Sequence, residues 1–225
     1  VKPGAVLDQG APPTLATPSP ADLASVTATS VELGVSVTDP DSGDLVVRFH
    51  TREVTDADDF TIAVLPDTQY YTVASHGWHE YFYDQTQWIM DNREAYNIVA
   101  AIHNGDLVHH GDDFESEWKV ADKAMKTLET SSSALPDGLP YGISVGNHDQ
   151  EPINSTGNTK KFNEYFGVSR FEGRAYYGGH YGSKNDESWF SFNASGIDFV
   201  VVNLQYDTTQ DPAVLSWAKG VFESH

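Results

Sequence analysis

Three short polar segments carry the residues best suited to chemistry. They are Asp67-Thr68-Gln69, Gly105-Asp106 and Asn147-His148-Asp149. Carboxylate oxygens, amide oxygens and imidazole nitrogens are ligands for divalent metals of hard or borderline character. A glycine precedes both Asp106 and Asn147, and glycine permits a sharp turn of the backbone. The segments can therefore form a metal centre if the fold brings them together.

Each polar segment directly follows an apolar run that is typical of a short strand. These runs cover residues 61–65, 98–102 and 141–145, and predicted helices over 79–96 and 115–128 separate them. Strands that alternate with helices indicate an α/β fold with at least partly parallel pairing. Ligand sites in such sheets gather at the carboxyl ends of the strands, so the three segments are expected to converge.

Apolar stripes at helical spacing identify the faces that the two predicted helices should bury. The first stripe consists of Tyr81, Phe82, Trp88 and Ile89, and the second of Trp118, Ala121, Met125 and Leu128. Two further strands are predicted at 189–192 and 199–204, and the short turn between them favours antiparallel pairing. A final helix is expected to begin near Asp211.

The first quarter of the chain has a different pattern. Residues 1–21 are rich in proline and are predicted to form a linker or an edge strand, and alternation over 31–37 and 45–49 predicts a β-hairpin. We therefore expect two domains, a linker with a partial Ig-like β segment at 1–56 and an α/β domain at 57–225. Asp39, Asp41 and Asp44 concentrate carboxylates between the predicted strands, but a β-turn is favoured over a calcium loop of EF-hand type.

Composition excludes several classes of partner. The 225 residues include 13 basic and 33 acidic side chains, for a net charge of −20. This balance disfavours the backbone of nucleic acids and anionic membrane surfaces as partners. The absence of cysteine excludes disulfides, thiolate metal sites and a cysteine nucleophile. The strong acidity, the absence of cysteine and a first residue other than methionine together predict a bacterial protein that is secreted, periplasmic or on the cell surface, with its leader removed.

The polar segments resemble the motifs D-x-H, G-D-x-x-D and G-N-H-[DE] of the calcineurin-like metallophosphoesterase family. The corresponding segments here are Asp67-Thr68-Gln69, Gly105-Asp106-Leu107-Val108-His109 and Gly146-Asn147-His148-Asp149. The order and spacing agree, and the resemblance covers roughly residues 60–225. Residues 176–182 and the strand at 199–204 are similar to the exported bacterial branch, in which a sandwich domain often precedes the catalytic one. The resemblance implies an α/β/β/α sandwich.

The resemblance also implies a mechanism for hydrolysing small phosphate monoesters or diesters. Two divalent metal ions (Mn, Fe, Zn or Ca) would share Asp106, with Asp67 and Gln69 on the first metal and Asn147 on the second. A hydroxide bridging the metals would attack phosphorus. His148 would protonate the leaving oxygen or stabilise its charge, and Asp149 would orient the imidazole of His148.

Two residues depart from the motifs. Gln69 occupies the position of the family's first histidine, where it either binds a metal through its amide oxygen or positions Asp67 by a hydrogen bond. His109 replaces the second aspartate of its motif, and with His110 it either approaches the metals or substrate or faces solvent. Tyr70 and His180 are further candidates for substrate binding, because aromatic rings near the site can stack on a nucleoside or aryl group, although packing within surface loops is the alternative.

The family's later histidine motifs do not occur before His225, so the resemblance implies a C-terminally truncated chain whose missing portion would supply them. One alternative function is a degenerate, non-catalytic module for binding or adhesion at the cell surface. Gln69 and the missing histidines favour it, whereas the intact 147–149 segment disfavours it. A second alternative is a structural protein stabilised by calcium.

Overall fold

The computed structural model describes residues 14–15, 37–38, 59–111, 114–153, 157–207, 209 and 211–225. The chain divides into two compact units, Val1–Ala57 and Asp58–His225. Among the described helices, none combines the length and the apolar character that crossing a bilayer requires.

The first unit contains one described strand pair. β1 (Thr14–Leu15) pairs antiparallel with β2 (Val37–Thr38). The hairpin predicted over 31–37 and 45–49 lies outside the described residues except for Val37, and the acidic turn at 39–44 lies wholly outside them.

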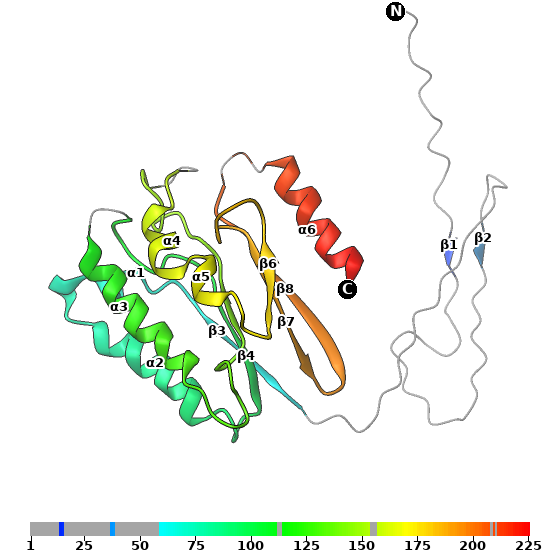
Figure 1. Cartoon of the computed structure of the whole chain (residues 1–225), viewed down its shortest axis with the longest axis horizontal. Coiled ribbons are helices and arrows are strands. Elements are labelled where there is room, and N and C mark those ends of the chain that lie inside the picture. The colour runs from blue at the N-terminus through cyan, green and yellow to red at the C-terminus, as the bar shows by residue number, and fades with distance from the viewer. Residues whose placement is uncertain are drawn as a thin grey trace, which may run out of the picture. The chain divides into compact units, whose positions relative to one another are not determined.

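A parallel sheet forms the centre of the second unit (Figure 1). It consists of β3 (Thr61–Leu65), β4 (Ile98–His103) and β5 (Tyr141–Ile143), in the order β3-β4-β5. Leu65 is paired with His103 and His103 with Ile143, so the three strands end at the same level. The predicted parallel pairing is confirmed, and the polar segments that follow the strands leave the sheet along one edge.

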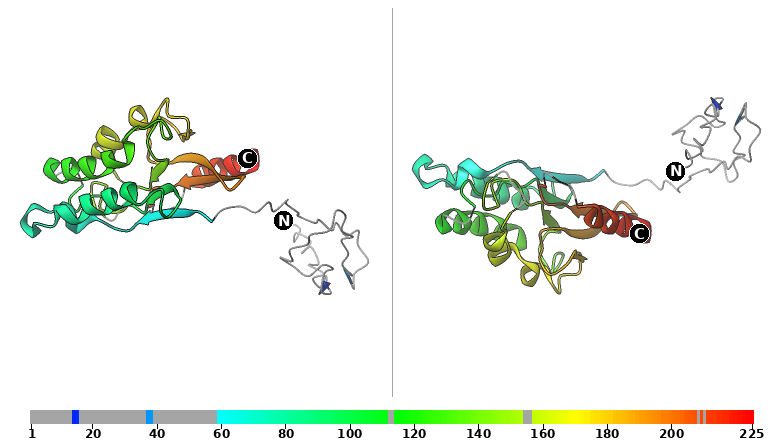
Figure 2. Two further views of the ribbon diagram at one scale, coloured as in Figure 1. Left: turned by 90° about the horizontal axis from the view of Figure 1, so that it is seen from below. Right: turned by 90° about the horizontal axis from the view of Figure 1, so that it is seen from above.

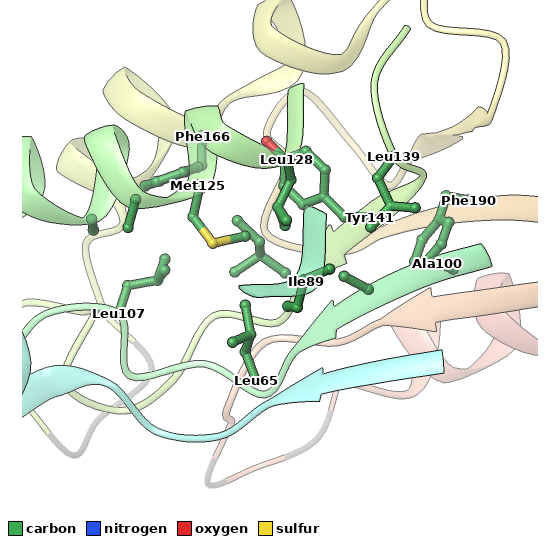
Figure 3. Close-up of a cluster of buried hydrophobic side chains, with 14 of the residues drawn as sticks. Leu65, Ile89, Ala100, Leu107, Met125, Leu128, Leu139, Tyr141, Phe166 and Phe190 are labelled. Atoms are coloured by element: carbon green, nitrogen blue, oxygen red, sulfur yellow. The ribbon is translucent and has the colours of Figure 1, made fainter. Parts of the chain in front are cut away.

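Helices flank this sheet (Figures 1 and 2). They are α1 (Gln69–Thr72), η1 (Ala74–His76), α2 (His79–Asp91), α3 (Glu115–Lys126), η2 (Thr127–Glu129), α4 (Lys160–Phe166) and α5 (Val168–Phe171). Figure 3 shows Leu65, Met125 and Tyr141 meeting in one cluster of buried side chains. Burial of this apolar surface is the main force that holds helices to sheet.

A second, antiparallel sheet packs against the first. It has the order β6-β7-β8, with β6 (Tyr177–His180), β7 (Ser188–Ala194) and β8 (Ile197–Asn203), and α6 (Pro212–Ser224) packs on β8. The predicted antiparallel pair is confirmed. Gly142 of β5 faces this sheet, and a Cβ there would clash with the ring of Phe190 and the amide of Asn203. The second unit is thus a mixed α/β fold with a parallel sheet, as expected.

The second predicted helix stripe is confirmed, and the first is wrong in part. Trp118, Ala121, Met125 and Leu128 are all buried. In α2, however, the buried positions are Phe82, Thr86 and Ile89, whereas Tyr81 is 58% exposed and Trp88 is 52% exposed. The helix also ends at Asp91 and not at residue 96. The narrow i, i+4, i+7 stripe is enough to cover the sheet, and Trp88 packs instead on the ring of Tyr96.

Arg170 joins four elements through buried charges. Its guanidinium donates to Glu129 of η2 and to Asp122 of α3, both at 2.7 Å, while its Nε lies 3.1 Å from Tyr141 Oη of β5. Tyr141 Oη itself donates to Glu129 at 2.6 Å. Arg170 and its two carboxylate partners are largely shielded from solvent. Among the described residues, removing Arg170 would leave Asp122 paired only with Lys126 and Glu129 paired only with Arg174.

We therefore predict that Arg170→Ala lowers the free energy of unfolding by about 1–3 kcal/mol, the usual cost of removing one partner of a buried hydrogen-bonded group, because each carboxylate keeps a second cation. Arg170→Lys should recover only part of the loss, because an ammonium cannot make the same fork of hydrogen bonds. The control is Lys119→Ala, which removes an exposed partner of Glu115 and should cost about 0–1 kcal/mol. Urea denaturation measures each value, and equal losses for Arg170→Ala and Lys119→Ala would contradict the prediction.

Glu187, directly before β7, lies in an acidic environment. Burial raises the pKa of its carboxyl to about 7, and the charges of Asp186, Asp207 and Asp211 act in the same direction, while Lys184 opposes them. In the unfolded chain the pKa of a glutamate is ~4.3. Between this pKa and the folded pKa of about 7, the folded protein holds a proton that the unfolded chain has lost. The contribution of Glu187 to stability is therefore complete below the unfolded pKa and is lost as the pH rises through 7.

Glu187→Gln should consequently raise the melting temperature at about pH 8, where the native side chain is charged, and should have little effect at about pH 4.5. Thermal denaturation followed by circular dichroism at the two pH values measures this difference. Glu172→Gln, at an exposed position, is the matched control. An identical shift at both pH values would show that the charge of Glu187 is not the cause.

Candidate metal centre

The loops after the three parallel strands contact one another directly. Thr68 N donates to the backbone oxygen of Asp106 at 3.1 Å, and His148 N donates to Asp106 Oδ1 at 2.8 Å. Gly105 and Asp106 both have positive φ, of 94° and 54°, which turns the chain sharply after β4. A Cβ at Gly146 would clash with the carboxylate of Asp106, so only glycine allows this approach.

Two carboxylates from different strands influence each other at this edge. Burial raises the pKa of Asp106, and the charge of Asp67 raises it further, while the backbone N–H groups of His148 and Asn147 act in the opposite direction. In the described part of the chain, no lysine or arginine forms an ion pair with either carboxylate. A divalent cation between two such anions would relieve their repulsion.

Gln69 is held at both ends of its side-chain amide. Its Nε2 donates to Asp67 Oδ2 at 2.9 Å, and its backbone N donates to Asp67 Oδ1 at the same distance. Its Oε1 lies 2.6 Å from Nδ1 of His109, which must therefore carry the proton. The two residues that depart from the family motif are thus hydrogen-bonded to each other. To bind a metal through Oε1, Gln69 would have to share that oxygen with His109.

Glu117, near the start of α3, fixes the loop that carries the adjacent histidines. Its buried carboxylate accepts the backbone N–H groups of His109 and His110 at 2.8 and 3.0 Å and pairs with His110 Nδ1 at 2.7 Å. The ring of His109 then stacks on that of His148, with centroids 4.9 Å apart. Glu117 is not among the residues predicted from the sequence, although an acidic residue in the first turn of a helix that follows two histidines is a usable signal.

His148 and Asp149 are oriented differently from the expectation. Nδ1 of His148 lies 2.8 Å from the carbonyl oxygen of His109, so it donates there and Nε2 is the nitrogen left for chemistry. Asp149 instead accepts N–H groups from Gly146 at 2.8 Å and Val108 at 3.2 Å. Burial raises the pKa of Asp149 to about 7. Asp149 therefore holds the backbone of the loops, and the carbonyl group of His109 orients the imidazole of His148.

Two buried side chains that were not predicted as site residues tie the loops together. Gln150 donates to the carbonyl oxygens of Gly146 and Tyr206, at 3.1 and 2.8 Å, and so links the loop after β5 to the segment after β8. Nδ1 of His103 accepts a hydrogen bond from Gly105 N, and Nε2 of His103 lies 3.1 Å from Thr68 Oγ1. Burial lowers the pKa of His103 to about 3, so the ring stays neutral in this link.

The remaining candidates for substrate binding lie in different surroundings. Tyr70 is half-exposed, and its ring centroid is 4.9 Å from that of His109, beside the centre. His180 lies on β6, where its Nδ1 is 3.1 Å from Tyr177 Oη. None of the contacts described for His180 reaches Asp67, Asp106 or His148.

The donor set fits part of a metal shell. Among the described residues, no three His, Cys, Asp or Glu side chains form a metal-binding group. What this edge supplies is two carboxylates, Asp67 and Asp106, with the backbone N–H of Asn147 bonded to Asp106. Oxygen donors of this kind suit hard divalent cations, which complete their shells with water or with further ligands.

Comparison with known proteins places the chain in a family. The family model for calcineurin-like phosphoesterase matches residues 60–219. The uncharacterized protein YvnB of Bacillus subtilis (strain 168) is 33% identical over 169 residues, which are 75% of this chain but only 12% of that relative. No solved structure matches the chain significantly. With the motifs and the strand-end geometry described above, this match shows that the chain belongs to the calcineurin-like phosphoesterase family.

Proposed function

We propose that this chain hydrolyses phosphate esters with the help of divalent metal ions held by Asp67, Asp106 and Asn147. The observation that carries the proposal is the contact between the loops after the three parallel strands, in which Thr68 N and His148 N both bond to Asp106. The charge of Asp67, which raises the pKa of Asp106, supports it. Family membership supports a metal-dependent hydrolase in general and favours it over a non-catalytic binding module.

In the proposed dinuclear centre, Asp67, Asp106 and Asn147 would hold the two cations, and Asp106 would be a ligand to both. When bound, the cations supply positive charge for the phosphoryl oxygens and make a water molecule more acidic. This local charge allows a protein of net charge −20 to accept a phosphate ester. Gln69 positions Asp67, because its amide group donates to that carboxylate.

His148 is the proposed acid for the leaving oxygen. The carbonyl group of His109 holds its Nδ1–H, which leaves Nε2 to carry the proton that the departing alkoxide needs. Its backbone N–H holds Asp106 at the same time. One residue therefore couples the position of the proton donor to the position of the shared carboxylate.

We predict that Asp106→Asn reduces Mn²⁺-dependent hydrolysis of bis(4-nitrophenyl) phosphate or 4-nitrophenyl phosphate by more than about 100-fold, since outer-shell changes alone typically cost 10–100-fold. The fold should survive, because the amide removes a partly buried charge whose pKa is already raised. Calorimetric titration with Mn²⁺ should show weaker binding. Asp91→Asn, at the exposed end of α2, is the control, and unchanged turnover in Asp106→Asn would refute the assignment.

A second prediction concerns Gln69 and His109 as a pair. Gln69→Ala and His109→Ala should each reduce metal affinity and kcat/KM by roughly 10–100-fold, because Gln69→Ala removes the amide that donates to Asp67 and His109→Ala removes the ring that holds this amide. The double variant should lose little more than either single variant, since both changes break one hydrogen-bonded chain. Additive losses would show that the two side chains act separately, and the exposed Gln87→Ala serves as the control.

A further inference from the structure

A row of aromatic rings extends from the candidate metal centre across the surface. We call Tyr70, His76 and Trp78 the aromatic row. The ring centroid of Trp78 lies 4.7 Å from that of His76, and the centroid of His76 lies 5.7 Å from that of Tyr70. Tyr70 continues at 4.9 Å to His109, which stacks on His148. The row is therefore continuous with the proposed proton donor.

The two largest rings of the row are open to a ligand. Tyr70 is 49% exposed and Trp78 is 44% exposed. Single exposed aromatic residues are common on protein surfaces, whereas a contiguous set beside a polar centre marks a binding surface. The backbone also holds the row in place, because His76 Nδ1 bonds to the carbonyl oxygen of Tyr70 at 3.2 Å. Gly77 then turns the chain with a φ of 68° between His76 and Trp78.

The chemistry of the row selects a planar, uncharged group. Tyrosine and tryptophan offer ring faces on which an aromatic ligand stacks in an offset or edge-on geometry. Among the described residues, no lysine or arginine stands over these rings, so no side-chain cation occupies the ring faces. The net charge of −20 also disfavours a substrate with several phosphates.

We propose that the aromatic row binds the planar aromatic group of a phosphate ester whose phosphorus lies at the candidate metal centre. This inference rests on the proposed phosphoesterase function and names its substrate class. Because Tyr70 contacts His109 whereas Trp78 is separated from it by His76 and Tyr70, Tyr70 binds the first ring attached to the ester. Trp78 serves substrates that extend further.

The test compares esters that share the same reacting group and differ in aromatic character. One pair is benzyl phosphate and cyclohexylmethyl phosphate, and the other is a nucleoside 5′-monophosphate and ribose 5-phosphate. Tyr70→Ala should lower kcat/KM for the aromatic member of at least one pair by about 10-fold, mainly through KM, as expected for one lost stacking contact. The non-aromatic member should change little. Trp78→Ala should have a smaller effect on benzyl phosphate than Tyr70→Ala has.

Two variants serve as controls. Tyr70→Phe keeps the ring and should restore discrimination between the members of each pair. Tyr81→Ala removes a tyrosine of similar exposure that packs on Tyr71 and lies outside the row, and it should leave discrimination unchanged. A loss confined to the benzyl pair would identify an aryl ester as the substrate, and a loss confined to the nucleoside pair would identify a nucleotide. Equal losses on all four esters in Tyr70→Ala would overturn the proposal, and so would an equal dependence of phosphocholine on Tyr70, which would indicate a cation site.

Binding without turnover separates this proposal from the proposed function. Calorimetric titration of the chain with benzylphosphonate and with adenosine measures recognition of the ring directly. If no ester is hydrolysed but one of these ligands binds and loses about 10-fold in affinity in Tyr70→Ala, the row stands while the hydrolytic function fails. If neither ligand binds to the parent chain, the aromatic row is not a ring-binding site, whatever the hydrolytic activity.

Discussion

The contact between the turns after β4 and β5 is the constraint on which the rest of the site depends. A Cβ at Gly105 would lie 2.7 Å from Gly146 N, and a Cβ at Gly146 would overlap Asp106. Two glycines therefore let the turns approach until His148 N reaches the carboxylate of Asp106. The parallel register supplies the other half of the constraint, because the strands end level with one another.

Around this contact, many buried polar groups position the loops and few are placed for direct chemistry. Glu117, Asp149, Gln150 and His103 are all buried, and each bonds to the backbone of a loop at the site. Burying polar groups is costly unless they are hydrogen-bonded, and here the bonds are made to backbone groups that would otherwise be unsatisfied. The arrangement fixes the positions of Asp106 and His148 in the folded chain.

The sequence predicted the parallel strands, the polar segments at their ends and the buried stripe of α3. These features follow from local patterns, namely apolar runs, glycine positions and helical periodicity. The partial error in α2 arose because aromatic residues were assumed to face the core, whereas Trp88 covers Tyr96 outside it. The roles of Glu117 and Gln150 depend on contacts with distant backbone groups. For the same reason, the imidazole of His148 bonds to the carbonyl group of His109 and not to Asp149 as predicted. Residue type alone does not reveal such contacts.

Gly142 gives the second sheet influence over a centre to which it contributes none of the three proposed ligands. The ring of Phe190 and the amide of Asn203 occupy the space that a side chain on β5 would otherwise fill. Their bulk limits how far β5 can slide or tilt, and Asn147 lies four residues beyond the end of that strand. Repacking of β7 or β8 would thus shift β5, so a change of sequence in the antiparallel sheet can alter the candidate metal centre without altering any residue there.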